Sequence, residues 1–448
     1  MLFLKKVIYR SHRSNKGNTF MSSAVDHLLR TPENSTFPDG SAIPEWFFAA
    51  SCNTNRDKKH YKVTDYGVLP DRDNLLQTTQ LQAVIDQAYN NGGGVIVFPA
   101  GTYCTGSLFF KPGTSLYLEK DAVILGSREI CDYKLLNTRI EGENVIYFAA
   151  LINADKVDGF SISGEGVIDG NGLDYWRHFW LRRKFNPNCT NMDEMRPRLL
   201  YVSESKNVFI TGVTIRNSAF WSCHFYRCDY LRIWQLSVTA PKAPVPSPST
   251  DAVDLDVCKN VLIKDCYFSV NDDGVALKGG KGPQANTAPE NGSNENIIID
   301  HCTFGPACHC TLTCGSETVY NRNIILQNSH LDNAARLFYL KMRPDTLQMS
   351  EYITVRNITG SCKLIFLANS WTQFRRCPEL YISGGRKIVL ENLNMTCQNI
   401  CQADKSDEYT LENVVFAHSC ITSKAPLQIE FEDGRPFDFS TTKITVSK

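Results

Sequence analysis

Short apolar runs with alternating polar positions recur along most of this chain. From about residue 157 they share one pattern, in which a polar residue and Asn precede Val or Ile, a variable position, Ile or Leu, a second variable position, and then Asn or Asp. Examples are SKNVFITGVTIRNS, CKNVLIKDCYFSVN, NENIIIDHCTFGPA and GRKIVLENLNMT. Alternation of this kind is typical of β-strands with one buried face. The chain is therefore predicted to consist largely of short strands.

The spacing of these repeats indicates how the strands are arranged. Successive units are 23, 30, 36, 27 and 29 residues apart, starting at Asn207, Tyr230, Asn260, Asn296, Asn323 and Tyr352. A constant strand pattern with variable spacing indicates a solenoid whose loops differ in length on one side. A leucine-rich repeat does not fit, because the spacing is looser and no Leu-x-x-Leu-x-Leu framework is present. The predicted fold class is all-β, a single-stranded right-handed parallel β-helix.

One amphipathic helix precedes the run of strands. Leu81, Val84, Ile85 and Ala88 follow the i, i+3, i+4, i+7 spacing of a helix with one apolar face. We expect this helix over about residues 75–91, where it would cap the open N-terminal end of the solenoid.

The region before the helix carries no such pattern. We predict a leader and polar arm over residues 1–45 and a β-helical catalytic domain over residues 46–448, with the catalytic coils at about 205–345. Residues 1–20 are basic and lack the apolar core of about 7–15 residues that a signal peptide needs. No apolar run approaches the roughly 20 residues that span a bilayer.

Composition narrows the classes of partner. The chain has 448 residues, of which 42% are hydrophobic and 21% charged, with 47 basic and 47 acidic side chains. This balance gives no indication of nucleic acid or a membrane surface as a partner, and we expect a monomer. The 17 cysteines show no disulfide-scaffold rhythm. Most fall in apolar strand segments, where we expect them to be small buried fillers, as at Cys258, Cys266, Cys302 and Cys397.

Three aspartates mark the most informative part of the chain. Asp272 and Asp273 follow Asp251 by 21 and 22 residues, which is about one circuit of the solenoid. Residues one circuit apart lie on adjacent coils, roughly 4.8 Å apart, so the three carboxyls would crowd together and at least one pKa should rise. One protonated and one ionised carboxyl is what hydrolysis of a glycosidic bond needs. An isolated Asp-Asp pair would be a solvated turn, but the surrounding repeats favour a site.

Polar groups continue at the corresponding strand end of the following coils. The four segments in question are Ser249-Thr250-Asp251, Asn271-Asp272-Asp273, Cys308-His309-Cys310 and Tyr339-Leu340-Lys341. This series resembles glycoside hydrolase family 28, the polygalacturonases and rhamnogalacturonan hydrolases, whose pattern is Asn-Thr-Asp, Asp-Asp, Gly-His-Gly and Arg-Ile-Lys. The resemblance extends over roughly residues 60–400. The differences from the family pattern are at Ser249, Cys308, Cys310 and Tyr339.

The resemblance implies a function and a role for each acid. The implied activity is hydrolysis of α-linked galacturonic acid bonds in pectin, without a metal or other cofactor and with inversion at the anomeric carbon. Inversion usually places acid and base about 6.5–9.5 Å apart, with water between them. Asp272 is expected to be the general acid, Asp251 and Asp273 to activate the water, and His309 to tune the shared proton. Removal of His309 should reduce the rate less than removal of Asp272. The alternative is that His309 has a structural role under the cleft, with its hydrogen bonds satisfied.

The resemblance also implies an acidic polysaccharide or oligosaccharide as partner, and a periplasmic or extracellular location. Lys341 is the expected clamp for a substrate carboxylate. Arg343, two positions along an extended strand, would face the same side and could replace the missing Arg. Lys278 and Lys281, in the glycine-rich loop after the acids, are further candidates for substrate binding. Each of these three has an alternative role as a solvated or structural charge, and Arg336 fits equally a cleft wall or a buried partner.

An aromatic and basic insert precedes the catalytic coils. Trp176, Phe179 and Trp180 could stack on sugar rings, and Arg182 and Arg183 could meet carboxylates. Packing is the favoured interpretation of such a stripe. A long loop that overhangs one end of the cleft would stop chain passage and favour attack on chain ends, so the expected enzyme is exo-acting.

Three alternatives compete with this interpretation. A zinc site at Cys308, His309, Cys310 and Cys314 is disfavoured, because strand alternation sends the first two cysteines to the face opposite the histidine. A β-helical pectate lyase would need a Ca²⁺ cage and give an unsaturated product. A non-catalytic carbohydrate-binding or adhesion solenoid would bind sugar without turnover.

Overall fold

The computed structural model describes residues 35–49, 57–72, 74–373, 381–403, 406–427 and 436–447. The chain divides into two compact units, Met1–Cys52 and Asn53–Lys448. The leader predicted over residues 1–45 lies mostly outside the described residues. In the described part of the first unit, Thr36 and Ala42 form an antiparallel bridge and η2 (Glu45–Phe47) is a short 3₁₀ helix. The described helices include none that is both long and apolar enough to cross a membrane.

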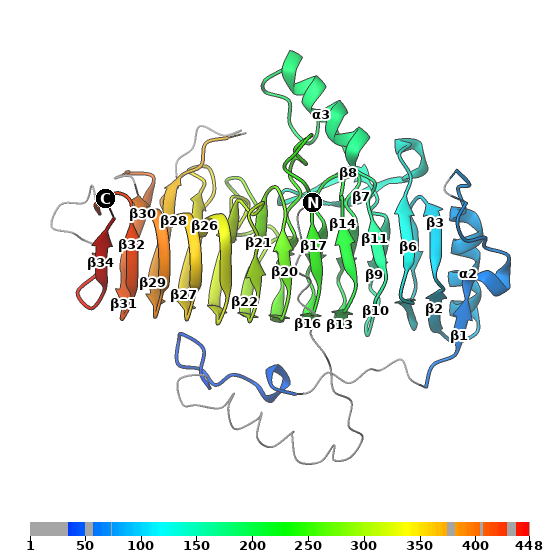
Figure 1. Ribbon diagram of the computed structural model, residues 1–448, viewed down its shortest axis with the longest axis horizontal. Helices are drawn as coiled ribbons and strands as arrows, with labels where there is room; N and C mark the ends of the chain where they lie inside the picture. Colours follow the sequence, from blue (N-terminus) through cyan, green and yellow to red (C-terminus); the bar gives the residue numbers. More distant parts are fainter. Residues whose placement is uncertain are drawn as a thin grey trace, which may run out of the picture. The chain divides into compact units, whose positions relative to one another are not determined.

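The second unit is a stack of parallel strands arranged in three series (Figure 1). The first series is a 13-stranded sheet. Its strands are β1 (His60–Lys62), β2 (Gly94–Phe98), β5 (Thr114–Leu118), β10 (Ser161–Gly164), β13 (Lys206–Thr211), β16 (Asp229–Trp234), β19 (Lys259–Lys264), β22 (Ser293–Asp300), β25 (Tyr320–Gln327), β27 (Met349–Arg356), β29 (Ser383–Glu391), β31 (Tyr409–Ala417) and β33 (Phe437–Asp438).

The second and third series join into a 19-stranded sheet through the long strand β26. The second series contains β3 (Gly101–Thr105), β6 (Ala122–Gly126), β11 (Val167–Asp169), β14 (Thr214–Arg216), β17 (Ser237–Thr239), β20 (Tyr267–Ser269), β23 (Thr303–Phe304), β26 (His330–Met342), β28 (Thr359–Ser370), β30 (Asn394–Ala403), β32 (Cys420–Ser423) and β34 (Lys443–Val446). The third contains β4 (Leu108–Phe110), β9 (Ile152–Asp155), β12 (Leu200–Ser203), β15 (Cys223–Tyr226), β18 (Val253–Asp256), β21 (Asp273–Lys278) and β24 (Cys310–Cys314). The predicted parallel β-helix is confirmed.

The core of the solenoid comes from the apolar positions of the repeat. The first of these positions is in register from coil to coil and is buried in each, as Val208, Leu231, Val261, Ile297, Ile324 and Ile353. The stack therefore buries columns of branched aliphatic side chains, and burial of each such side chain stabilises the fold by roughly 1.5–3 kcal/mol. The cysteines predicted as fillers lie in this core, and every described cysteine is free.

The recurrent Asn of the repeat has a conformational cause. The residues at this position, from Asn207 to Tyr352, all have φ between 51° and 59°, in the left-handed region that Asn tolerates better than most residues. The asparagine side chains also bond to each other along the stack. Asn296 Nδ2 donates to Asn260 Oδ1 and Asn323 Nδ2 donates to Asn296 Oδ1, each at 3.2 Å. The Asn thus turns the chain and joins neighbouring coils.

The N-terminal end is covered as predicted. Helix α2 (Thr78–Asn90) packs against β2 and β4, and buries Leu81, Val84, Ile85 and Ala88. It lies at the end of the stack opposite to β34 (Figure 1). The apolar stripe of the sequence is therefore the face that closes the solenoid.

Among the described residues, two insertions with secondary structure of their own leave the regular coil. One is an antiparallel hairpin of β7 (Leu135–Ile140) and β8 (Glu143–Phe148), which the sequence analysis did not predict. The other is helix α3 (Leu173–Phe185), formed by the aromatic and basic insert that we expected to be a long loop. Helix α3 projects from the stack in Figure 1. Both insertions contribute residues to the candidate site.

Candidate active site

The three aspartates of the sequence analysis lie together. Val253 on β18 pairs with Val275 on β21, and the backbone N–H of Ala252 donates to Asp273 O at 2.9 Å. This register sets Asp251 beside Asp273, with Asp272 next to it. One carboxylate oxygen from each of the three lies within 4.8 Å of the others. The stacking of adjacent coils therefore assembles a carboxyl cluster from residues one circuit apart.

This separation is shorter than the sequence analysis expected. Enzymes that invert usually hold their two carboxyls about 6.5–9.5 Å apart, whereas those that retain configuration hold them about 5–5.5 Å apart. The oxygens of Asp251, Asp272 and Asp273 fall below the first range. The reason is the stacking itself, since consecutive coils lie roughly 4.8 Å apart.

The pKa values of the three carboxyls are driven in opposite directions. Burial, and then the charges of Asp272 and Asp254, raise the pKa of Asp251 well above its usual value. Burial and the charge of Asp273 also raise the pKa of Asp272, as the crowding argument predicted. Burial alone would raise the pKa of Asp273, but the nearby ammonium group of Lys341 lowers it overall. The cluster therefore combines two carboxyls whose pKa shifts favour the protonated form with one whose pKa shift favours the ionised form.

Lys341 and Lys278 are the positively charged partners of the carboxyls in this cluster. Lys341 Nζ donates to Asp273 Oδ2 at 2.7 Å and lies over the rings of Tyr339 and Trp371, 5.2 Å from each centroid. Lys278, only 5% exposed, has its Nζ 4.0 Å from Asp251 Oδ2. Both ammonium groups have a pKa raised above the usual value: burial opposes the charged form, but the surrounding carboxylates outweigh it.

Two acids in this network were missed by the sequence analysis. Asp254, fully buried on β18, has an oxygen 3.8 Å from Lys278 Nζ. Burial, only partly offset by Lys278, raises the pKa of Asp254 well above its usual value. Glu317 Oε2 lies 3.3 Å from the same Nζ. Burial would raise the pKa of Glu317, but Lys278 and then Lys281 lower it overall. The sequence does contain a signal for Asp254: in AVDLDV this acid stands between Val253 and Leu255, which are both core residues.

His309 lies at the rim of the cluster. It is exposed, and its backbone N–H donates to Asp272 O at 2.9 Å. The structure brings it close enough to Asp272 and Asp273 for its charge to lower the pKa of both. Cys308 and Cys310 are fully buried, on the side of the strand away from this exposed ring. Among the described residues, the only group of three or more potential metal ligands is the aspartate cluster itself.

The acids open into a cleft of about 320 Å³. Its aromatic walls are Phe179 of α3, Trp221, Tyr339 and Trp371. The remaining charged residues that line it are Glu141 of the hairpin tip, Arg183 of α3, and Arg336 of β26. Arg336 is thus a wall residue, with its guanidinium 5.5 Å from the Tyr339 ring centroid. The cleft offers carboxyls at its floor and both cations and aromatic rings around them.

Two predicted substrate-binding residues lie outside the cleft lining. Arg343 is 2% exposed and forms two hydrogen bonds to Asp345, Nε to Oδ1 at 2.8 Å and Nη2 to Oδ2 at 2.7 Å. Strand alternation does not extend to Arg343, because β26 ends at Met342. Lys281 is held by Glu143 and Glu141, with Nζ to Oε2 distances of 3.0 and 3.8 Å.

Most of the aromatic insert packs rather than faces the cleft. Trp176 is 2% exposed and its Nε1 donates to Ser218 O, while Trp180 Nε1 donates to Pro246 O. Arg182 pairs with Glu194 at 2.9 Å. Phe179 lines the cleft but is 2% exposed and lies under the guanidinium of Arg196. The packing interpretation therefore holds for most of this stripe.

Comparisons with known proteins support this picture. A family model described as glycosyl hydrolases family 28 matches residues 136–362. A probable polygalacturonase of Vitis vinifera is 29% identical over 226 residues, 49% of this chain and 44% of the relative. A polygalacturonase of Chamaecyparis obtusa is 31% identical over 290 residues, 63% of this chain and 48% of the relative. The chain thus spans about half the length of these curated relatives.

A solved structure extends the likeness over most of the fold. The exopolygalacturonase of Thermotoga maritima superposes with a TM-score of 0.75, covering 90% of this chain and 95% of that one at 19% identity. At this identity the likeness supports the β-helix alone. The family model, by contrast, covers half of the sequence and includes the aspartate cluster and Lys341. On that match, the protein belongs to glycosyl hydrolase family 28.

Proposed function

We propose that this protein hydrolyses α-linked galacturonic acid bonds in pectic polysaccharide or oligosaccharide. The observation that carries the proposal is the carboxyl cluster, in which burial raises the pKa of Asp272 while Lys341 lowers that of Asp273. Glycoside hydrolysis needs a carboxyl that can donate a proton and another that is ionised. The curated relatives that match this chain include polygalacturonases, which supports the same substrate class.

In this mechanism Asp272 protonates the glycosidic oxygen as the bond to the anomeric carbon breaks. Asp273, ionised beside Lys341, takes a proton from the attacking water. Asp251 holds its own proton in the unliganded site, because burial raises its pKa, and it orients that water by hydrogen bonding. His309, at the rim, is proposed to tune the proton on the cluster.

Lys341 and Lys278 are proposed to bind the substrate carboxylate. An ammonium group has three donors, so Lys341 can keep its bond to Asp273 and still meet a uronate. Arg336 and Arg183 line the same cleft and replace Arg343 in this role. Lys281 is proposed to act less directly, since it holds Glu141 of the cleft wall.

Exo action is supported by the β7–β8 hairpin. Arg139 of β7 reaches Asp256 on β18, with Nε 3.0 Å from Oδ2, and Arg198 Nη1 donates to Arg139 O at 2.8 Å. His224 and Asp256 beneath this hairpin are fully buried. The hairpin therefore covers the sheet at Asp256, which pairs with Lys278 of the cleft, and it would obstruct a polysaccharide on that side. We propose that the cleft accepts chain ends for this reason.

The stereochemical outcome proposed is inversion, on the family resemblance. The short distances between the three carboxyls instead favour retention, because retaining glycosidases usually hold their carboxyls closer together than inverting ones. NMR of the first product separates the two: the β-anomer is expected, and initial release of the α-anomer would overturn inversion. The same spectra on polygalacturonate and rhamnogalacturonan oligomers identify the linkage cleaved and the chain end attacked.

One specific observation favours a second candidate, a metal-dependent lyase. Three carboxylates with oxygens within 4.8 Å of each other could hold a divalent cation. A lyase would lose activity in EDTA and release an unsaturated, ultraviolet-absorbing product. We expect full activity in EDTA and no such absorbance.

The proposed location is periplasmic or extracellular, on the family resemblance. Fractionation of producing cells tests this, with recovery in the cytoplasmic fraction as the contrary result.

A further inference from the structure

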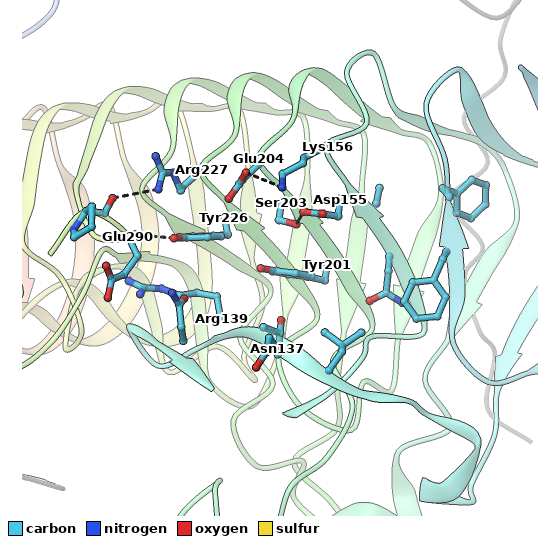
Figure 2. Close-up of a pocket in the computed structure, with 18 residues that line it drawn as sticks. Asn137, Arg139, Asp155, Lys156, Tyr201, Ser203, Glu204, Tyr226, Arg227 and Glu290 are labelled. Atoms are coloured by element: carbon cyan, nitrogen blue, oxygen red, sulfur yellow. Dashed lines mark hydrogen bonds and ion pairs between the residues drawn. The ribbon is translucent and has the colours of Figure 1, made fainter. Parts of the chain in front are cut away.

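A second and larger cavity lies on the same sheet face as the aspartate cleft. Its volume is about 950 Å³. Strands β9, β12 and β15 form its floor through Asn153, Tyr201, Ser203 and Tyr226. The hairpin strand β7 and the turns that carry Lys156, Glu204 and Arg227 form its walls (Figure 2). The floor also includes β4, so the groove extends across four successive strands, about 15 Å.

The hairpin separates this groove from the aspartate cleft. Arg139, which closes one end of the groove, is 1% exposed and bonded to Asp256 and to Asn291 Oδ1, the latter at 2.6 Å from Nη2. Its guanidinium lies 5.1 Å from the Tyr226 ring centroid. Within the described part of the chain, no residue lines both cavities. The groove is therefore a site of its own and not a continuation of the cleft.

The charges that line the groove balance each other. Lys156 Nζ lies 3.6 Å from Glu204 Oε2, and Arg227 donates to Pro289 O at 3.2 Å. Asp155 accepts a hydrogen bond from Ser203 at 2.6 Å. The lining contains three basic side chains, Lys156, Arg227 and Arg139, and three acids, Asp155, Glu204 and Glu290. An anionic ligand would gain no net attraction here, so the fitting ligand is uncharged.

The remaining groups suit a ligand with many hydroxyls. Asn137 and Asn144 are exposed on the hairpin, and no side-chain hydrogen bond joins either of them to another described residue. Each amide offers two donors and an acceptor. Half-buried Phe109 adds apolar surface to the floor, and the mostly buried rings of Tyr201 and Tyr226, on neighbouring strands, add smaller areas. Concave sites that combine aromatic surface with a few oriented polar groups are typical of ligand-binding pockets.

We propose that this groove is a second carbohydrate-binding site, which holds an uncharged oligosaccharide. It would bind a neutral segment of the polysaccharide while the aspartate cleft acts on a uronate chain end. The proposal goes beyond the hydrolytic function and does not depend on it, because binding in the groove needs none of the cleft residues.

The test uses the full chain carrying Asp272→Asn, so that turnover does not interfere. Saturation-transfer NMR and calorimetry would measure binding of two neutral probes, galactotetraose and arabinotetraose, and of tetragalacturonate. Asn137→Trp fills the groove from an exposed hairpin position. Leu181→Trp, exposed on α3 and outside both cavities, is the matched control, and thermal unfolding checks that both variants fold.

At least one neutral probe should bind, and Asn137→Trp should weaken that binding at least tenfold while Leu181→Trp leaves it unchanged. Affinity for tetragalacturonate should be the same in all three proteins. The proposal is overturned if neither neutral probe binds, if Asn137→Trp has no effect, or if tetragalacturonate displaces the neutral probe competitively. None of these results bears on whether the parent protein hydrolyses galacturonan.

Discussion

Lys341 Nζ lies 2.7 Å from Asp273 Oδ2, and this contact joins β26 to β21, which are two coils apart with β24 between them. Lys341 is thus the counter-ion that keeps one member of a crowded carboxyl cluster ionised. Burial raises the pKa of Asp273, and Lys341 is the largest of the charges that lower it. The division between proton donor and base in the proposed mechanism depends on this pair.

Replacing Lys341 should change the pH dependence of the reaction. In Lys341→Met the pKa of Asp273 rises, because the largest charge that opposes the effect of burial is removed, so the base is protonated over a wider acidic range. The acidic limb of the kcat/KM profile should therefore move to higher pH. Lys341→Arg, which keeps a positive charge, should move it much less. An unchanged acidic limb in Lys341→Met would show that Asp273 is not the titrating base.

Glu317 is expected to position Lys278. It is the acid with the shortest distance to Lys278 Nζ, 3.3 Å, compared with 3.8 Å for Asp254 and 4.0 Å for Asp251. In Glu317→Gln the ammonium should shift toward the aspartates, lower their pKa values, and reduce kcat/KM by about tenfold, equivalent to about 1.4 kcal/mol. The shift should also move the pH profile, which loss of packing alone would not do.

The matched control for this variant is Glu143→Gln. It removes a comparable pair, with Lys281 Nζ 3.0 Å away, from a position outside the cleft lining. Its kcat/KM should stay within twofold of the parent. Equal losses in the two variants would mean that Glu317 has no specific role.

The asparagine column should contribute to stability through backbone conformation. Asn296 has a φ of 58° and bonds to Asn260 and Asn323. Asn296→Val loses both bonds and forces a β-branched residue into the left-handed region, which should lower the free energy of unfolding by about 2–3 kcal/mol. Asn296→Gly loses the same bonds without the strain, so it should unfold at higher urea than Asn296→Val. Coincident urea midpoints would contradict this account.

The repeat architecture and the aspartate cluster could be predicted because both depend on periodicity. Stacked coils have a fixed rise, so residues 21 and 22 positions apart had to meet, and they do. The stripe of Leu81 and Val84 also defined the buried face of α2. These are local patterns that the tertiary structure repeats without change.

The positions of Arg343, Lys281 and the β7–β8 hairpin could not be predicted, because they lie where the regular strand pattern ends. Arg343 was expected to face the cleft by strand alternation, but it follows the last residue of β26 and turns to Asp345. Lys281 lies after a run of glycines, where the sequence sets no side-chain direction. The β7–β8 hairpin did have a signal, the Glu-Gly turn at 141–142 between two alternating segments. Its pairing with Asp256 through Arg139 joins residues 117 positions apart, which no local pattern reveals.

The kinetics of Asp272→Asn test the central claim most directly. The amide preserves the shape of the side chain but cannot donate the proton that the leaving oxygen needs, and general acid catalysis contributes roughly 10²–10⁴-fold. On polygalacturonate, kcat should therefore fall by about 10³-fold while the Kd for tetragalacturonate changes less than about threefold. A kcat within tenfold of the parent, with binding intact, would contradict the assignment of these carboxyls as the catalytic centre.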